Sequence, residues 1–126
     1  MRVQRIDHVV LTVADIERTI AFYGRVLGMS AVSFGEGRRA LACGDQKLNL
    51  HQAGREFVPK AARPTPGEID LCFTTDVPLA EVAAHLRAQS VEIELGPVDK
   101  TGARGPLRSL YFRDPDGNLI EVSNEV

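Results

Sequence analysis

The chain has 126 residues, of which 44% are hydrophobic and 25% are charged, and its formal net charge is −2. This length suits one globular domain that buries its core without a disulfide or a structural metal. The near balance of 15 basic and 17 acidic residues argues against nucleic acid or a membrane as the main partner. No apolar run reaches the roughly 18 residues of a membrane span, and the start of the chain lacks the features of a signal peptide.

The first half of the chain begins with a predicted strand and helix. Residues 5–13 are rich in β-branched residues, and their alternation places His8, Val10 and Thr12 on the same face as Ile6. Asp15 stands where a helix N-cap is expected, and Gly28 stands at the C-terminal end of the apolar helical pattern between them.

Three short strands are predicted next, with turns between them, near residues 30–34, 38–43 and 46–52. This half therefore has the pattern βαβββ and forms a module of about residues 1–54. Residues 55–66 lack a clean period and contain three prolines, which indicates a linker or flap.

The second module, about residues 67–126, repeats the order of elements. The segment IDLCFTTD aligns with IDHVVLTV of the first module, and a helix that begins at Pro78 follows it. We expect a return strand near 91–95, a long loop over 96–106, and a final hairpin of strands 107–114 and 118–125. The two cysteines, Cys43 and Cys72, have no CxxC spacing and are predicted to be reduced and buried in a cytoplasmic protein.

Glu121 is an acid inside the last predicted strand, which is otherwise apolar. It is either a solvent-facing residue of a half-buried strand or a metal ligand that points into a lined cavity. The repeat supplies candidate partners, because His8 and Asp70 occupy equivalent first strands while His51 and Glu121 lie in the last strands. Such nitrogen and oxygen donors suit Fe(II), Mn, Ni or Zn.

Each candidate also has a structural interpretation. His8 could be a core histidine, His51 an edge residue, and Asp70 a local capping residue. Asn49 shares a face with His51 by the period of two, so either side chain could be the inward polar group.

Two segments, IDHVVLTVADIERTIAFYGRVLGM and LYFRDPDGNLIEV, resemble the vicinal oxygen chelate superfamily. This superfamily contains glyoxalase I, bleomycin-resistance proteins, fosfomycin-resistance enzymes and extradiol dioxygenases. The resemblance covers essentially the whole chain. Within the superfamily, the sequence is similar to the glyoxalase domain-containing protein 5 group and to virulence-associated bacterial relatives.

The resemblance implies an α+β fold in which paired βαβββ modules form a curled, cup-shaped mixed sheet with flanking helices. It also implies one divalent metal ion on the inner wall, with His8 and Glu121 as ligands. The end of the first module supplies a further ligand or a substrate contact, which would be His51 or Asn49. Asp70 stands where glyoxalases and fosfomycin enzymes commonly have histidine, and this departure weakens the transfer of their chemistry.

Strand parity places Ser109, Tyr111 and Arg113 on one face of the penultimate strand, and the first two match substrate-contacting positions of the fosfomycin-resistance branch. Tyr111 could equally pack in the core. Arg104 and Lys100 lie in a predicted loop, where they could close over an anionic ligand or remain solvated.

We therefore expect a metal-dependent, glyoxalase-like lyase or isomerase in which Glu121 moves a proton. The alternatives are an Fe(II) extradiol-type dioxygenase, a thiol or water transferase like the fosfomycin-resistance enzymes, and a non-catalytic protein that sequesters its ligand. Family members of this size usually associate, so we also expect a homodimer with sites at or near the interface.

Overall fold

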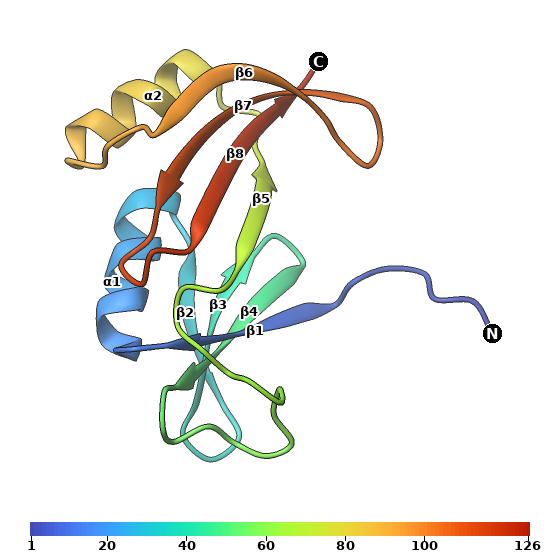
Figure 1. The fold of residues 1–126 in the computed structure, drawn as a ribbon, viewed down its shortest axis with the longest axis vertical. Coiled ribbons are helices and arrows are strands. Elements are labelled where there is room, and N and C mark those ends of the chain that lie inside the picture. Colours follow the sequence, from blue (N-terminus) through green and yellow to red (C-terminus); the bar gives the residue numbers. More distant parts are fainter. The chain divides into compact units, whose positions relative to one another are not determined.

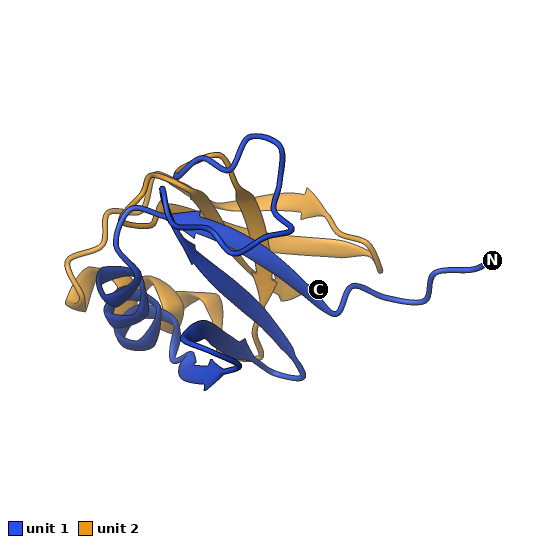
Figure 2. Ribbon diagram, turned by 90° about the horizontal axis from the view of Figure 1, so that it is seen from below, with its two compact units in different colours: residues 1–66 blue, residues 67–126 orange.

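The computed structural model describes residues 1–126, which divide into two compact units, Met1–Pro66 (unit 1) and Gly67–Val126 (unit 2) (Figure 2). Each unit contains a strand, a helix and three further strands in that order (Figure 1). The predicted α+β class with paired βαβββ modules is therefore confirmed. Neither helix is long and apolar enough to cross a membrane.

Unit 1 forms one four-stranded sheet with the strand order β1-β4-β3-β2. Its elements are β1 (His8–Val13), α1 (Ile16–Leu27), β2 (Ser30–Phe34), β3 (Arg38–Cys43) and β4 (Gln46–Gln52). The first and last strands pair in parallel, and the other neighbours are antiparallel. All of these elements agree with the sequence prediction except for the start of the first strand.

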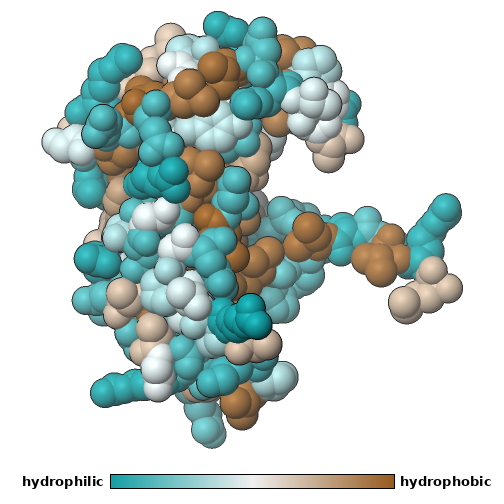
Figure 3. Space-filling model, viewed as in Figure 1, coloured by the Kyte–Doolittle hydropathy of each residue, from teal (hydrophilic) through white to brown (hydrophobic).

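The first strand begins at His8, so residues 5–7 lie outside it. The N-terminal segment before His8 extends away from β1 (Figure 1). Polar and apolar side chains alternate along it (Figure 3), and Val3 and Ile6 are 79% and 65% exposed. These β-favouring residues form no strand because no neighbouring strand pairs with them.

The first helix begins and ends as its sequence predicts. The side chain of Asp15 accepts a hydrogen bond from the backbone N–H of Arg18 at 3.1 Å. Gly28 ends the helix in the left-handed conformation, with φ of 67°, which a residue without Cβ adopts readily. The helix buries Tyr23 and Val26, while the alternate β1 residues Leu11 and Val13 are buried on the sheet.

Unit 2 repeats this arrangement with the strand order β5-β8-β7-β6. Its elements are β5 (Asp70–Thr74), α2 (Leu79–Ala88), β6 (Leu95–Thr101), β7 (Pro106–Arg113) and β8 (Leu119–Glu125). The first and last strands of the unit are again parallel neighbours. Its buried core comes from one face of α2 and from alternate residues of the central strands, namely Leu79, Ala83, Leu86, Leu110, Phe112, Ile120 and Val122.

The predicted position of one strand in unit 2 was wrong. The return strand is not at 91–95 but at Leu95–Thr101, inside the segment that was expected to be a loop. Gly96 and Pro97 concealed it, because both residues usually interrupt strands. Proline is tolerated here since β6 is an edge strand, and the register with β7 shifts between Leu95 and Val98.

The turn between β7 and β8 is held by one carboxylate. Oδ1 of Asp114 accepts hydrogen bonds from the backbone N–H groups of Asp116 and Asn118, both at 2.9 Å, and Oδ2 accepts one from Asn118 Nδ2 at 2.8 Å. Gly117 has a φ of 86°, as the turn requires. Asn118 Oδ1 in turn accepts from the backbone N–H of Ile69 at 2.9 Å, which ties the turn to the start of β5.

Candidate functional site

Each sheet has one face that carries the helix and one that does not, and we call the second the helix-free face. In β1 the burial pattern places Leu11 and Val13 toward the helix and His8 on the helix-free face. The same alternation and the strand register place every predicted site residue of β1, β4, β5, β7 and β8 on the helix-free face of its own unit.

His8 is the first residue of β1, at the edge of the sheet of unit 1. Its Nδ1 lies 2.9 Å from Oδ1 of Asp7, and this hydrogen bond lowers the pKa of the Asp7 carboxyl. A carboxylate on one ring nitrogen fixes the orientation of the imidazole and leaves the other nitrogen, Nε2, as a donor atom. Histidines that bind metal ions usually have such a partner.

Asn49 and His51 are both buried on the helix-free face of β4, with 8% and 6% of their surface exposed. Oδ1 of Asn49 is buried and has no hydrogen-bond partner. The ring of His51 packs edge-on against Phe57, with 5.8 Å between the ring centroids. Burial lowers the pKa of His51 and the nearby positive charge of Arg38 lowers it further, against a smaller opposite effect of Glu56, so the environment favours the neutral imidazole.

Glu121 lies on the helix-free face of β8, and a cluster of hydroxyl groups holds its carboxylate. Ser109 Oγ donates a hydrogen bond to Oε2 at 2.6 Å, and Ser123 Oγ donates to the same oxygen at 3.3 Å. The two serine oxygens lie 2.7 Å apart, and neither residue is exposed to solvent. These bonds fix one carboxylate oxygen and leave Oε1 outside the serine pair.

Tyr111 and Cys72 stand beside Glu121 in the register of the sheet, on β7 and β5 respectively. Burial raises the pKa of Tyr111 to about 12, and the carboxylate of Glu121 contributes to this rise. Tyr111 therefore keeps its proton at neutral pH. The thiol of Cys72 lies 3.4 Å from Ser123 Oγ, and partial desolvation of the sulfur by its neighbours raises its pKa as well.

The two cysteines are free, but neither is buried as the sequence predicted. Cys43 is partly exposed and Cys72 is exposed. Cys72 is exposed because β5 is an edge strand and because its side chain is on the helix-free face.

The registers of the two sheets show which positions are equivalent in the repeat. His8 pairs with Lys47 at the start of β1, and Asp70 pairs with Leu119 at the start of β5. Asn49 lies two residues after Lys47 on β4, and Glu121 lies two residues after Leu119 on β8. Asn49 of unit 1 therefore corresponds to Glu121 of unit 2. His51 corresponds in the same way to Ser123.

The two predicted substrate-binding arginines both have carboxylate partners. Arg104 binds Glu125 through Nη2 at 2.6 Å and Nε at 3.1 Å. Arg113 binds Glu94 through Nε at 3.0 Å, and Glu94 belongs to the stretch before β6. These pairs neutralise the charges, so either guanidinium would have to leave its partner to bind a substrate anion.

The predicted site residues thus form two groups. Unit 1 holds His8, Asn49 and His51, and unit 2 holds Asp70, Arg104, Ser109, Tyr111, Arg113 and Glu121. Within neither unit do three His, Cys, Asp or Glu side chains gather into a metal-binding cluster. The individual donors nevertheless fit a divalent ion, since the imidazole of His8 has its orienting carboxylate and the carboxylate of Glu121 is fixed through one oxygen.

Sequence reasoning missed two neighbours of His51. Arg38 lies over the ring of Phe57, with its guanidinium carbon 4.6 Å from the ring centroid. The parity of β3 could have placed Arg38 on the helix-free face, because Ala40 of the same strand pairs with Asn49. Strand parity could not have placed Phe57 near His51, because Phe57 lies outside any strand.

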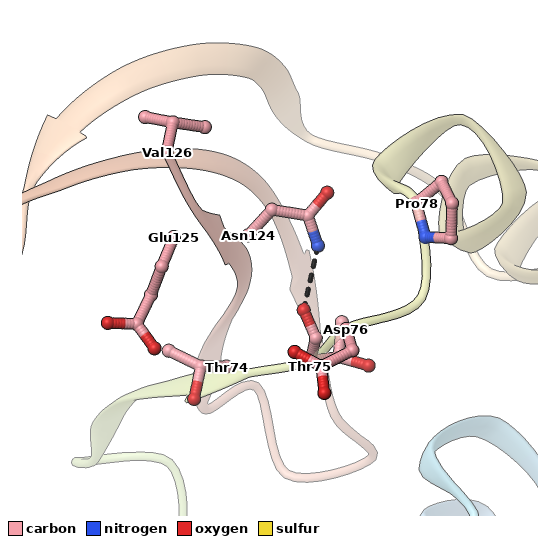
Figure 4. A pocket seen from close by; sticks show the side chains of 7 residues that line it. All are labelled: Thr74, Thr75, Asp76, Pro78, Asn124, Glu125 and Val126. Atoms are coloured by element: carbon pink, nitrogen blue, oxygen red, sulfur yellow. Dashed lines mark hydrogen bonds between the residues drawn. The ribbon is translucent and has the colours of Figure 1, made fainter.

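A cavity of about 530 Å³ lies elsewhere in unit 2, beyond the C-terminal end of β5 (Figure 4). None of the predicted site residues lines it; the lining is Thr74, Thr75, Asp76, Pro78, Asn124, Glu125 and Val126. Asn124 Nδ2 donates to the backbone oxygens of Thr75 and Val77, both at 2.9 Å, and its Oδ1 accepts from the backbone N–H of Leu79 at 2.9 Å. This side chain therefore caps α2, in the place where Pro78 provides no side-chain cap.

Residues 5–122 match the family model described as the glyoxalase/bleomycin resistance protein/dioxygenase superfamily. Virulence protein STM3117 of Salmonella typhimurium is 56% identical over 126 residues, which cover 100% of this chain and 88% of that protein. Its crystal structure has a TM-score of 0.98, with complete coverage of both chains.

Two further relatives carry names that refer to a domain or an activity. Glyoxalase domain-containing protein RDO1 of Mycosarcoma maydis is 52% identical, over 98% of this chain and 70% of that protein. Glutathione transferase FosA of Serratia marcescens is 28% identical, over 94% of this chain and 79% of that protein. The chain belongs to the glyoxalase/bleomycin resistance protein/dioxygenase superfamily.

Proposed function

We propose that this protein is a divalent-metal-dependent, glyoxalase-like enzyme of the lyase or isomerase type that acts on a small oxygen-rich substrate. The observation that carries the proposal is the carboxylate of Glu121, which two buried serines hold through one oxygen on the helix-free face of β8. A solvent-facing glutamate on a half-buried strand would need no such support. Family membership and the relative named as a glutathione transferase support an enzymatic role.

The ligands that we propose for the ion are His8 and Glu121, with His51 and Asp70 as further candidates. The ion is Ni, Zn, Mn or Fe, with one ion per site. When bound, it would act as a Lewis acid on adjacent substrate oxygens. His8 belongs to unit 1 and Glu121 to unit 2, so the metal content of a variant of each residue tests each proposed ligand separately.

The neighbours of Glu121 have distinct roles in this proposal. Glu121 accepts and returns the proton that the reaction moves. Ser109 fixes the direction of the carboxylate by its hydrogen bond to Oε2. Tyr111, whose pKa is raised to about 12, stays protonated and can donate a hydrogen bond to a substrate oxygen.

Elemental analysis of protein purified without added metal tests the proposal. We expect about one divalent ion per chain, a strong loss of metal in Glu121→Gln, and unchanged metal in the control Glu81→Gln, an exposed acid on α2. Metal-loaded protein should then be assayed with hemithioacetals, catechols and epoxides to identify the reaction. A protein that contains no metal and ignores added Ni, Zn, Mn and Fe would instead be a ligand-sequestering member of the family.

We also propose that the protein is a cytoplasmic homodimer. The two free cysteines suit a reducing compartment. Sedimentation analysis at micromolar concentration should give twice the chain mass, and a monomeric mass would contradict the dimer.

A further inference from the structure

Asn49 carries a buried acceptor that the protein itself does not satisfy. The side chain is 8% exposed, and its Oδ1 has no hydrogen-bond partner. Its register neighbours are Val10 on β1 and Ala40 on β3, and neither side chain has a donor. Buried polar atoms in folded proteins nearly always have a partner, so this oxygen is an acceptor that is available to a donor group of a bound molecule.

Arg38 lies on the same helix-free face, near Asn49. It is two residues before Ala40 on β3, so its Cα is about 7 Å along the strand from the position opposite Asn49. Its guanidinium is held over the ring of Phe57 at 4.6 Å. An aromatic ring holds the planar group in place without neutralising its charge.

Arg38 differs from the other three arginines of the strands, Arg39, Arg108 and Arg113, in having no carboxylate partner. Five other arginines form ion pairs, which are Arg5–Asp45, Arg39–Glu17, Arg104–Glu125, Arg108–Asp99 and Arg113–Glu94. A second cation adds to the positive charge on this face, because Lys47 of β4 lies over the ring of Phe34 at 3.7 Å. An oriented guanidinium without an anion is the group that best matches a carboxylate or phosphate.

We propose that Arg38, supported by Phe57, and Asn49 form a subsite for a small oxyanion that also carries a hydroxyl or amide donor. The guanidinium binds the anionic group, and Oδ1 of Asn49 accepts the hydrogen bond from the donor. The two side chains start from positions about 7 Å apart along the strand, so probes that carry the two groups several bonds apart are the first to test. This inference rests on the proposed function, because it specifies the class of substrate that the enzyme binds.

Amide-shift titrations of ¹⁵N-labelled protein in the presence of EDTA test the subsite without any metal ion. Four probes separate its two contacts. 4-Hydroxybutyrate has both groups, butyrate lacks the hydroxyl, 1,4-butanediol lacks the anion, and glycerol 3-phosphate replaces the carboxylate with a phosphate. We expect a hydroxylated anion to bind more tightly than butyrate and the diol. The ratio between 4-hydroxybutyrate and glycerol 3-phosphate identifies the preferred anion, and either preference supports the subsite.

Variants then assign each contact. Arg38→Gln should weaken the hydroxylated anions about tenfold, the size of one lost charge-assisted contact, and should leave the diol unchanged. Asn49→Leu should abolish the preference for 4-hydroxybutyrate over butyrate. Without ligand, Asn49→Leu should be at least as stable as the wild type, because leucine removes the unsatisfied acceptor at similar volume. Arg5→Gln, which removes an exposed cation of the same unit, is the control and should bind like the wild type.

Three results would overturn the proposal: no saturable binding of any anionic probe, unchanged binding by Arg38→Gln, or an equal loss in Arg5→Gln. If Asn49→Leu instead lowers the metal content and keeps the preference for the hydroxyl, Asn49 serves the metal ion and its part in the subsite is refuted. Metal content is measured separately, so the two proposals can fail independently. If the protein contains no metal and still distinguishes these anions, the proposed metal-dependent enzyme is refuted and the proposed subsite is supported.

Discussion

Ser109 Oγ donates a hydrogen bond to Oε2 of Glu121 across 2.6 Å, from a position with no exposed surface. The two residues come from adjacent antiparallel strands, β7 and β8, and both are on the helix-free face. Ser109 is therefore a positioning residue, because it acts on the proposed metal ligand and does not itself bind the ion.

Ser109→Ala should leave the fold intact and weaken metal binding by about tenfold, because partners that orient ligands typically contribute that much. A competitive chelator titration measures the affinity. Ser30→Ala, at an exposed position of β2, is the matched control. Equal affinities of Ser109→Ala and wild type would show that the hydrogen bond serves only the packing of the sheet.

Asp114→Ala should destabilise unit 2 by about 3 kcal/mol, since the carboxylate accepts three hydrogen bonds and bonds to a charged group are the stronger ones. Urea unfolding measures the change. Asp76→Ala, in the exposed stretch before α2, should change the free energy of unfolding by less than about 0.5 kcal/mol. Similar effects of the two substitutions would contradict the role given to Asp114.

Glu56 gives unit 1 a pH-dependent stability. The backbone N–H of Gly54 donates to its Oε2 at 2.7 Å and lowers the pKa of Glu56 below its ordinary value of 4.5. The carboxyl of Glu56 binds a proton less readily in the folded protein than in the unfolded chain. The stability that the ionised carboxylate contributes is therefore present above pH 4.5. It is lost as the pH falls through the folded pKa.

Glu56→Gln should therefore be less stable than the wild type at pH 7, and the difference should shrink as the pH is lowered below 4.5. Urea midpoints measured over this range provide the test. Glu36→Gln is the control, because Glu36 lies in an exposed turn and forms no hydrogen bond or ion pair. Parallel pH curves for wild type and Glu56→Gln would refute the assignment.

Asn124→Ala should destabilise unit 2 by about 2 kcal/mol, because it removes the side chain that caps α2 and leaves two backbone oxygens without this donor. Thermal unfolding followed by circular dichroism should show the loss. Asn124→Asp keeps the acceptor for the N–H of Leu79 but turns a carboxylate oxygen toward the backbone oxygens of Thr75 and Val77, so it should also be less stable than the wild type. Unchanged stability of both variants would show that the hydrogen bonds of Asn124 do not stabilise unit 2.

The elements of unit 1 could be predicted because local signals agree with the tertiary structure. Asp15 and Gly28 are the caps of α1, and the turns separate strands of clear composition. The strand β6 could not be predicted, because its pairing with β7 overrides the local preferences of Gly96 and Pro97.

The faces of the strands could be predicted, but the partners of the side chains could not. Parity correctly grouped Ser109 with Tyr111, since the period of a strand depends only on backbone geometry. The pairing of Arg104 with Glu125 joins residues that are distant in the sequence. The oxygen of Asn49 is unsatisfied because its neighbours on the adjacent strands have no side-chain donor, and no local sequence pattern encodes which residues lie on adjacent strands.

The parallel pairing of first and last strands has a consequence for synthesis on the ribosome. β5 has only β8 as a strand neighbour, so residues 70–74 cannot pair with another strand until residues 119–125 have been translated. At typical bacterial and eukaryotic elongation rates this delay is roughly 3 to 10 s. Unit 1 meanwhile has all of its strands, since its own first strand needs only residues 46–52. Nascent chains should thus acquire protease resistance in two successive steps, with the N-terminal half protected while Phe73 and its strand are still open to chaperones.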